Sequence, residues 1–261
     1  MVQIRLSLIF IITLFASFFM VGVGHARVVK IGIGFSLPPY VIMKDDTGLE
    51  VDVIRESFAA VGLDAEFVYL PNLRLPVAFA DGMVDCVATN VAYDVSGESG
   101  LKACGSDVTL FFQNYAIAVK SAGYDLKSID DLKDKVVLGF NNAVKYLGPD
   151  FAAVAAGNPN YTELADQSLQ VRMLYSGRVQ VVISDKRVFH YWRKVLLQMP
   201  VAETLDLNQD IQFFPIFAPA PRHLSFSDVE LCRAFNQGLR LLHSTGVYEG
   251  IIQRYVDVEI E

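Results

Sequence analysis

The sequence predicts an α/β protein of two lobes, in which the chain crosses from the first lobe to the second and later returns. Strand–helix–strand patterns occur at residues 65–88 and 135–184, and such units imply parallel strands with right-handed crossovers. Two long apolar runs, 108–120 and 212–219, separate these regions. The first run would extend about 40 Å, which is too long for a typical single strand, so it is interpreted as a crossing from one lobe to the other. The second run is interpreted as the return crossing.

The N-terminal residues 1–26 have the pattern of a secretory signal. Arg5 supplies a positive charge, residues 6–21 are apolar and uncharged, and Gly24-His25-Ala26 forms a small-x-small cleavage site. The alternative is a membrane anchor, for which this apolar run is short. Cleavage after Ala26 predicts export to the bacterial periplasm or the cell exterior.

Charge and cysteine content narrow the class of protein further. The formal net charge is −7 and no basic block occurs, so nucleic acids and anionic membranes are poor partners. The three cysteines, Cys86, Cys104 and Cys232, are too few for a disulfide framework. Export permits one bridge, and the spacing favours Cys86 with Cys104, which leaves Cys232 as a buried thiol.

The elements expected in the first lobe follow from periodicity and from glycine and proline positions. They are a strand at 28–35, a Pro-Pro loop at 36–40, a turn at 45–48, a helix at 50–61, a strand at 65–70, a helix at 75–81 and a strand at 84–88. Pro76 suits a first helical turn, and Gly82 suits a helix end. The C-terminal helices at 227–243 and 247–255 complete this lobe.

The second lobe repeats the pattern with a strand at 135–140, helices at 143–156 and 168–176, a strand at 179–184 and a helix at 186–198. Gly177 ends the helix before the last of these strands, as Gly82 does in the first unit. The predicted organisation is therefore a signal at 1–26, a first lobe of 27–114 with 216–261, and a second lobe of 115–215.

Small ligands bind open parallel sheets beyond the carboxyl ends of the strands. The residues that fall there, at strand ends or helix starts of both units, are Phe35, Tyr40, Arg74, Thr89, Asn90, Asn141, Asn142 and Asp185. Arg74 precedes a helix, where a carboxylate would be favoured by its guanidinium and by the helix dipole. Each residue also has an alternative role without a ligand. Arg74 would be an ordinary surface residue, Asp185 and the asparagines would cap helices, and the aromatic rings would pack in the core.

Signs of catalysis and of metal binding are weak. The four histidines lie far apart, and none has metal-ligand spacing to another ligand type. The segment Gly97-Glu98-Ser99-Gly100 lacks the GxSxG pattern of a nucleophile elbow. We therefore expect a binding protein and not an enzyme, with no metal and no cofactor.

Six segments together resemble the family 3 solute-binding proteins, the polar amino-acid binders of bacterial ABC transporters. In order they are SLPPY (36–40), GLEVDV (48–53), LPVAFADGMVD (75–85), DLKDKVVLG (131–139), GRVQVVISD (177–185) and GVYEGIIQRY (246–255). The resemblance implies a type II periplasmic-binding-protein-like fold with two crossover strands as its hinge. It also implies that Asp185 holds a ligand ammonium group.

Two departures from the family pattern concern the ligand carboxylate. The family arginine that clamps this group falls near Gly97 here, and no arginine occurs in residues 75–120. The family Gly-Thr pair at the helix start of the second lobe is Asn141-Asn142. Arg74 is therefore predicted to be a substitute anion anchor for a zwitterionic or small polar ligand.

The expected function is capture of a small solute by hinge closure in the periplasm. The expected partner is an ABC permease in the inner membrane, and the expected state is a monomer. A ligand-sensing protein that signals to a membrane sensor is one alternative. An enzyme of the cyclohexadienyl-dehydratase type is the other, because fold alone does not separate these functions.

Overall fold

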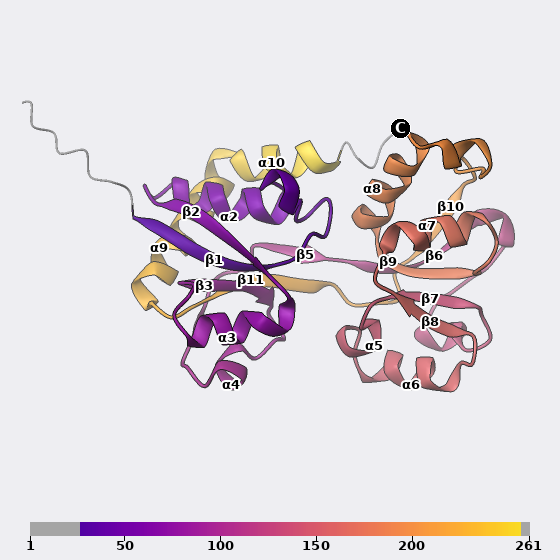
Figure 1. Cartoon of the computed structure of the whole chain (residues 1–261), viewed down its shortest axis with the longest axis horizontal. Helices are drawn as coiled ribbons and strands as arrows, with labels where there is room; N and C mark the ends of the chain where they lie inside the picture. Colours follow the sequence, from indigo (N-terminus) through magenta and orange to yellow (C-terminus); the bar gives the residue numbers. More distant parts are fainter. Residues whose placement is uncertain (1–26, 257–261) are drawn as a thin grey trace, which may run out of the picture.

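The computed structural model describes residues 27–256, apart from the side chains of Glu203 and Val256. The predicted signal at 1–26 lies outside the described residues. Two sheets lie side by side, each covered by helices on both faces, and extended segments run between them (Figure 1). Within the described part of the chain, no helix has the length and apolar character needed to cross a membrane.

The first sheet has the strand order β2-β1-β3-β11-β4, and β5 also pairs with β11. Its strands are β1 (Val28–Gly34), β2 (Asp64–Leu70), β3 (Cys86–Asn90), β4 (Cys104–Gly105), β5 (Leu110–Phe112) and β11 (Ala220–Phe226). Strands β2 and β3 are both parallel to β1, which lies between them, whereas β11 is antiparallel to its neighbours.

Helices cover both faces of this sheet because its strands are buried on both sides (Figure 1). They are α2 (Leu49–Ala59), α9 (Val229–Thr245) and α10 (Val247–Val256) on one face, and α3 (Leu75–Ala80) and α4 (Val95–Ser99) on the other. Val29, Ile31 and Ile33 alternate along β1 into the core beneath α2 and α9. The predicted helices of this lobe are confirmed to within a few residues at each end.

The second sheet has the order β10-β6-β9-β7-β8. Its strands are β6 (Asn114–Val119), β7 (Val137–Phe140), β8 (Tyr161–Leu164), β9 (Val181–Asp185) and β10 (Ile211–Phe214). The helices that cover it are α5 (Ala143–Tyr146), α6 (Pro149–Gly157), α7 (Gln167–Tyr175) and α8 (Lys186–Leu197). Val181 and Ile183 face one core and Val182 the other, as the two-residue period of a strand requires.

Several elements differ from those expected. The helix predicted at 143–156 is two helices, because Gly148 has φ 90° and Pro149 begins a new first turn. Strands β8 and β11 were not predicted. Single 3₁₀ turns complete the connections: η1 (Met43–Asp45), η2 (Asn72–Arg74), η3 (Lys120–Ala122), η4 (Ile129–Leu132) and η5 (Pro200–Glu203).

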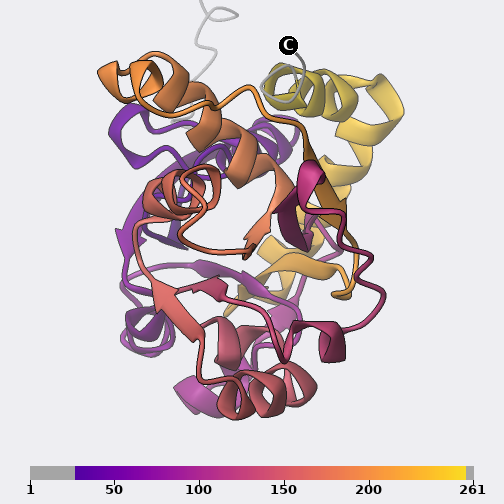
Figure 2. The ribbon, with the colours of Figure 1, turned by 90° about the vertical axis from the view of Figure 1, so that its right-hand side faces the viewer.

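The chain passes between the sheets twice, as predicted. β5 pairs with β11 in the first sheet, and after Gln113 the chain continues as β6, which pairs with β9 and β10 in the second sheet. The return runs from β10 to β11 through residues 215–219. Seen end-on, the second lobe lies in front of the first (Figure 2).

Helix α8 belongs to the second lobe but also packs on the first. Val188 is 1% exposed and lies in the core cluster formed by α2, α9 and β1. Trp192, one turn later, contacts this cluster and the cluster of the second lobe. The two lobes therefore share an apolar contact in addition to their covalent connections.

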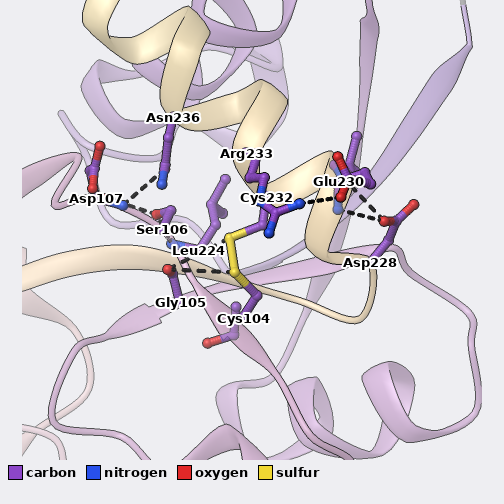
Figure 3. The surroundings of a disulfide bond; sticks show 12 residues. Cys104, Gly105, Ser106, Asp107, Leu224, Asp228, Glu230, Cys232, Arg233 and Asn236 are labelled. Atoms are coloured by element: carbon purple, nitrogen blue, oxygen red, sulfur yellow. Dashed lines mark hydrogen bonds and ion pairs between the residues drawn. A yellow bond between two sulfur atoms is a disulfide. The ribbon is translucent and has the colours of Figure 1, made fainter.

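The predicted Cys86–Cys104 bridge is wrong, because the disulfide joins Cys104 to Cys232, 128 residues apart (Figure 3). Cys86 is a free, fully buried thiol whose strand partners are Ile31 and Phe226. Cys104 lies opposite Phe226 on β11, and β11 leads directly into α9, which carries Cys232. Proximity in sequence was misleading, because a strand not predicted from the sequence brings α9 to β4.

Candidate ligand-binding cleft

The predicted ligand residues are distributed along the edges where the strands of both sheets end. In the first lobe, Phe35 and Tyr40 follow β1, Arg74 precedes α3, and Thr89 and Asn90 end β3. In the second lobe, the edge residues are Asn141, Asn142 and Asp185. A hydrogen bond from Tyr40 Oη to Asp185 Oδ2, 2.9 Å long, joins the two edges.

The Asp185 carboxylate is surrounded by donors from both lobes and from the crossing. Oδ2 accepts from Tyr40 Oη and, at 2.8 Å, from the backbone N–H of Gln113. Oδ1 accepts from the N–H groups of Arg187 at 2.8 Å and Val188 at 3.3 Å, which caps α8. Burial raises the pKa of Asp185, while these four hydrogen bonds oppose that rise.

The sequence predicted that Asp185 would hold a ligand ammonium group, and this role stays a prediction. An ionised carboxylate offers about four acceptor positions, and four protein donors use those of Asp185. The side chain is 7% exposed. In this structure Asp185 therefore connects Tyr40, the crossing at Gln113 and the start of α8.

An aromatic and charged cluster that was not predicted lies beside Tyr40. The Tyr40 ring packs on Phe112 with 4.3 Å between centroids, and the Arg222 guanidinium lies 4.7 Å from the Phe112 centroid. Arg222 also donates from Nε to Glu50, which is 1% exposed, over 2.9 Å. The only signal for these residues in the sequence was that Phe112 falls inside a predicted crossing.

The N-terminus of α5 is capped by a carboxylate from the strand β8. Glu163 on β8 accepts from the N–H of Asn142 at 2.7 Å and from that of Val144 at 3.0 Å. Tyr161 Oη donates to the same carboxylate at 2.7 Å, and burial together with this bond raises the Tyr161 pKa. The side chains of Asn141 and Asn142 are exposed.

Glycine is required on β7 for this arrangement. A Cβ atom on Gly139 would lie 2.5 Å from Tyr161 Oη and 3.2 Å from the Ala143 side chain. Tyr161 therefore reaches Glu163 across a space that only glycine leaves open.

A second carboxylate caps the short helix α4 in the first lobe. Asp94 accepts from the N–H of Gly97 at 2.9 Å. A Cβ atom on Gly97 would lie 2.4 Å from Asp94 Oδ2. Near the sequence position of the family arginine, this chain therefore places the Asp94 carboxylate against a glycine. The absence of the arginine and the presence of this cap are thus parts of one local arrangement.

The remaining predicted residues of the first lobe differ in exposure. Phe35 is 53% exposed, whereas Thr89 is 5% exposed and its hydroxyl has no hydrogen-bond partner among the described residues. Asn90 accepts from the N–H of Ala92 at 3.3 Å. The Arg74 side chain is exposed and makes no hydrogen bond or ion pair with any residue of 27–256.

A hollow of about 280 Å³ lies beside the end of β3, lined in part by Tyr93, Asp94, His223 and Ser225. Burial raises the pKa of Tyr93, and the charges of Glu98 and of the Tyr146 hydroxyl add to this rise.

No family model matches the chain. A probable ABC transporter extracellular-binding protein, YckB of Bacillus subtilis, is 25% identical over 175 residues. The match covers 65% of this chain and 56% of that relative, so the chain spans little more than half of the relative's length.

Solved structures resemble the chain over most of its length. The GluR0 ligand-binding core in complex with L-glutamate has a TM-score of 0.67 and 18% identity, covering 89% of this chain and 99% of that one. A histidine kinase sensor domain similar to periplasmic binding proteins scores 0.65 at 16% identity, over 88% and 96%. An ancestral amino-acid-binding protein, a precursor of cyclohexadienyl dehydratase, scores 0.63 at 17% identity, over 87% and 95%.

At these identities the structural likenesses show the fold alone, and they agree with the motifs and with the sheet topology. The crossing segments, the two sheets and the helix start at Asp185 lie where the resemblance placed them. The resemblance to the family 3 solute-binding proteins is therefore confirmed, and the chain is an α/β protein with the two-lobed periplasmic-binding-protein fold.

Proposed function

We propose that this protein captures a small polar or amino-acid-like solute between its lobes by hinge closure. The lobes are residues 27–114 with 216–261, and residues 115–215. The observation that carries the proposal is the position of Asp185, which receives donors from Tyr40 of the first lobe and from Gln113 of the crossing. A group at the end of β9 is thereby coupled to the relative position of the lobes, as ligand-driven closure requires.

The proposed setting is the periplasm, with an ABC permease of the inner membrane as partner and a monomer as the working state. The name of the B. subtilis relative supports the transport role. The Cys104–Cys232 disulfide supports export, because disulfides persist in oxidising compartments. The predicted signal at 1–26, cleaved after Ala26, is part of the same proposal.

A sensing role is the second candidate, because a histidine kinase sensor domain shares the fold. An enzymatic role is the third candidate, because a precursor of cyclohexadienyl dehydratase also shares the fold. We favour binding over catalysis, because a general acid or base must have a free position toward its substrate. The buried carboxylate between the lobes, Asp185, has its acceptor positions filled by the protein.

A thermal-shift screen of a metabolite library on residues 27–261 tests this proposal. A ligand that binds only the folded state raises the melting temperature by mass action, so at least one small polar solute will give a concentration-dependent rise. Unchanged melting across the library would contradict capture of a solute of this class. Turnover of a cyclohexadienyl acid would instead support the enzyme.

Arg74 is proposed as the anchor for a negatively charged end of the solute. Arg74→Ala should weaken binding of the solute found in the screen by about 10- to 100-fold, because a charge-assisted hydrogen bond contributes roughly 1.5–3 kcal/mol. Calorimetric titration measures this. Arg233→Ala on α9 is the matched control, because Arg233 is also exposed and, within residues 27–256, pairs only with its helix neighbour Glu230. Equal affinities of the two variants would make Arg74 an ordinary surface residue.

A further inference from the structure

The three cysteines of the chain lie close together in the first lobe, around one residue of β11. Cys86 on β3 and Cys104 on β4 are the direct strand partners of Phe226, one on each side. Cys232 on α9 is joined to Cys104 (Figure 3). Cys86, Phe226 and Cys232 belong to the same core cluster, and Cys104 packs against it. The free thiol and the bridge are therefore separated by a single strand.

The strand order β3-β11-β4 excludes a bridge between Cys86 and Cys104 in the folded protein. Opposite residues of antiparallel strands are about 5 Å apart at Cα, so two such steps separate these cysteines by about 10 Å. A disulfide spans at most about 7 Å between Cα atoms. Cys86 and Cys104 can therefore be joined only while β11 is absent from the sheet, and their bridge would keep β11 from inserting between β3 and β4.

Sequence separation favours this incompatible bridge in the unfolded chain. Cys104 follows Cys86 by fewer than twenty residues, whereas 128 residues separate Cys104 from Cys232. Because the entropic cost of closing a loop rises with the logarithm of its length, the short loop closes roughly 20-fold more often. The chain also emerges N-terminus first during synthesis, and Cys232 is the last cysteine to appear. Oxidation before folding therefore joins mainly Cys86 to Cys104.

We propose that the native disulfide forms by exchange from a Cys86–Cys104 bridge, in which Cys86 is a temporary partner. Two thiols and one glutathione disulfide first give that bridge and two reduced glutathiones. The Cys232 thiolate then attacks the Cys104 sulfur, the Cys86–Cys104 bond breaks, and Cys86 leaves as a thiolate that takes a proton from water. This second step needs no oxidant, because one disulfide replaces another. The proposal concerns assembly of the first lobe and is independent of solute capture.

The fold makes this exchange one-directional. Once β11 has inserted beside β3, Cys86 is fully buried and Phe226 lies between it and Cys104. Burial raises the pKa of the Cys86 thiol, and the charge of Asp85 adds to this rise. Because only a thiolate attacks a disulfide, the buried and protonated Cys86 does not reverse the exchange. A free thiol is thereby kept next to the native bridge without breaking it.

The order in which the bridges form tests the proposal. Reduced protein (residues 27–261), unfolded in guanidinium, is diluted into native buffer that contains glutathione disulfide. Samples are alkylated at increasing times, and their bridges are mapped by mass spectrometry of peptides. Cys86–Cys104 should be the main bridge at first and should then be replaced by Cys104–Cys232. Formation of Cys104–Cys232 from the start, with no earlier Cys86–Cys104 species, overturns the proposal.

Two single variants form a matched pair, because each leaves only two cysteines. Cys86→Ala keeps only the native pair and omits the exchange, so under the same conditions it should reach the native near-UV circular dichroism spectrum at least tenfold faster than the wild type. Cys232→Ala keeps only the incompatible pair. It should reach a native-like spectrum when it is reduced and fail to do so when its two thiols are oxidised before folding.

Equal folding rates of Cys86→Ala and the wild type would make Cys86 an ordinary core residue and overturn its role in exchange. The same holds if oxidised Cys232→Ala folds as well as its reduced form. If reduced Cys232→Ala does not fold either, the order of bridges in the wild type and the folding rate of Cys86→Ala decide the question. None of these results bears on solute capture, which is tested on protein that carries its native bridge.

Discussion

Removing the disulfide lowers the free energy of unfolding by about 4–5 kcal/mol, because the bridge closes a loop of more than a hundred residues in the unfolded chain. Cys104 and Cys232 are separated by 128 residues, and they connect β4 to α9 (Figure 3). The bridge thereby ties the two chain segments that build the first lobe, with the whole second lobe between them. Guanidinium unfolding of the double variant Cys104→Ala/Cys232→Ala, against the oxidised wild type, measures the difference.

Cys86→Ala is the control for this comparison, because it also removes a buried sulfur but no covalent link. Its cost should be about 1 kcal/mol, the usual size for a single core substitution. Thiol titration of the unfolded, unreduced protein should find one free thiol, that of Cys86. Three free thiols, or a double variant as stable as the wild type, would show that the bridge does not form.

Gly238→Ala should destabilise the protein by about 3 kcal/mol or more, because helices α2 and α9 meet there with no room for a side chain. A Cβ atom on Gly238 would lie 1.8 Å from the carbonyl oxygen of Ser57 and 2.8 Å from its carbonyl carbon. Both are backbone atoms, so the clash is relieved only by moving one helix away from the other. Urea unfolding monitored by circular dichroism gives the loss.

Gly250→Ala on α10 makes the same chemical change in a helix with open space. Apart from its chain neighbours and the backbone of its own helix, no atom of the described residues lies within 4 Å of a Cβ built on Gly250. This variant should be more stable than the wild type by about 0.5–1 kcal/mol, because alanine loses less backbone entropy than glycine in a helix. Similar effects of the two substitutions would mean that α2 and α9 are not packed as closely as described.

Local pattern was sufficient to predict the elements that surround the cleft. β1, α2, the unit from β2 to β3, and the strand that ends at Asp185 all carry strong periodicity and glycine or proline signals. These signals act within a few residues, which is why element type and order could be predicted. The first crossing was predicted from length, because an apolar run that is too long for one strand must continue elsewhere, and the second long apolar run was then interpreted as the return.

The partners of the site residues could not be predicted in the same way. Asp185 bonds to Tyr40, 145 residues earlier, and no local pattern marks such a pair. β11 begins with Ala220-Pro221 and lacks regular alternation, although it pairs with β3, β4 and β5. Glu163 lies on the four-residue strand β8, and its role depends on N–H groups around 20 residues before it. Tertiary packing, and not propensity, decides these contacts.

The central claim, that a solute moves the two lobes relative to each other, can be tested with the protein's own reporter. The chain contains one tryptophan, Trp192, and its ring contacts the core clusters of both lobes. We predict that the solute that raises the melting temperature also shifts the Trp192 emission, with saturation at the same solute concentration, and that Trp192→Phe abolishes this signal. Saturable binding with an unchanged emission maximum, intensity and acrylamide quenching would contradict hinge closure.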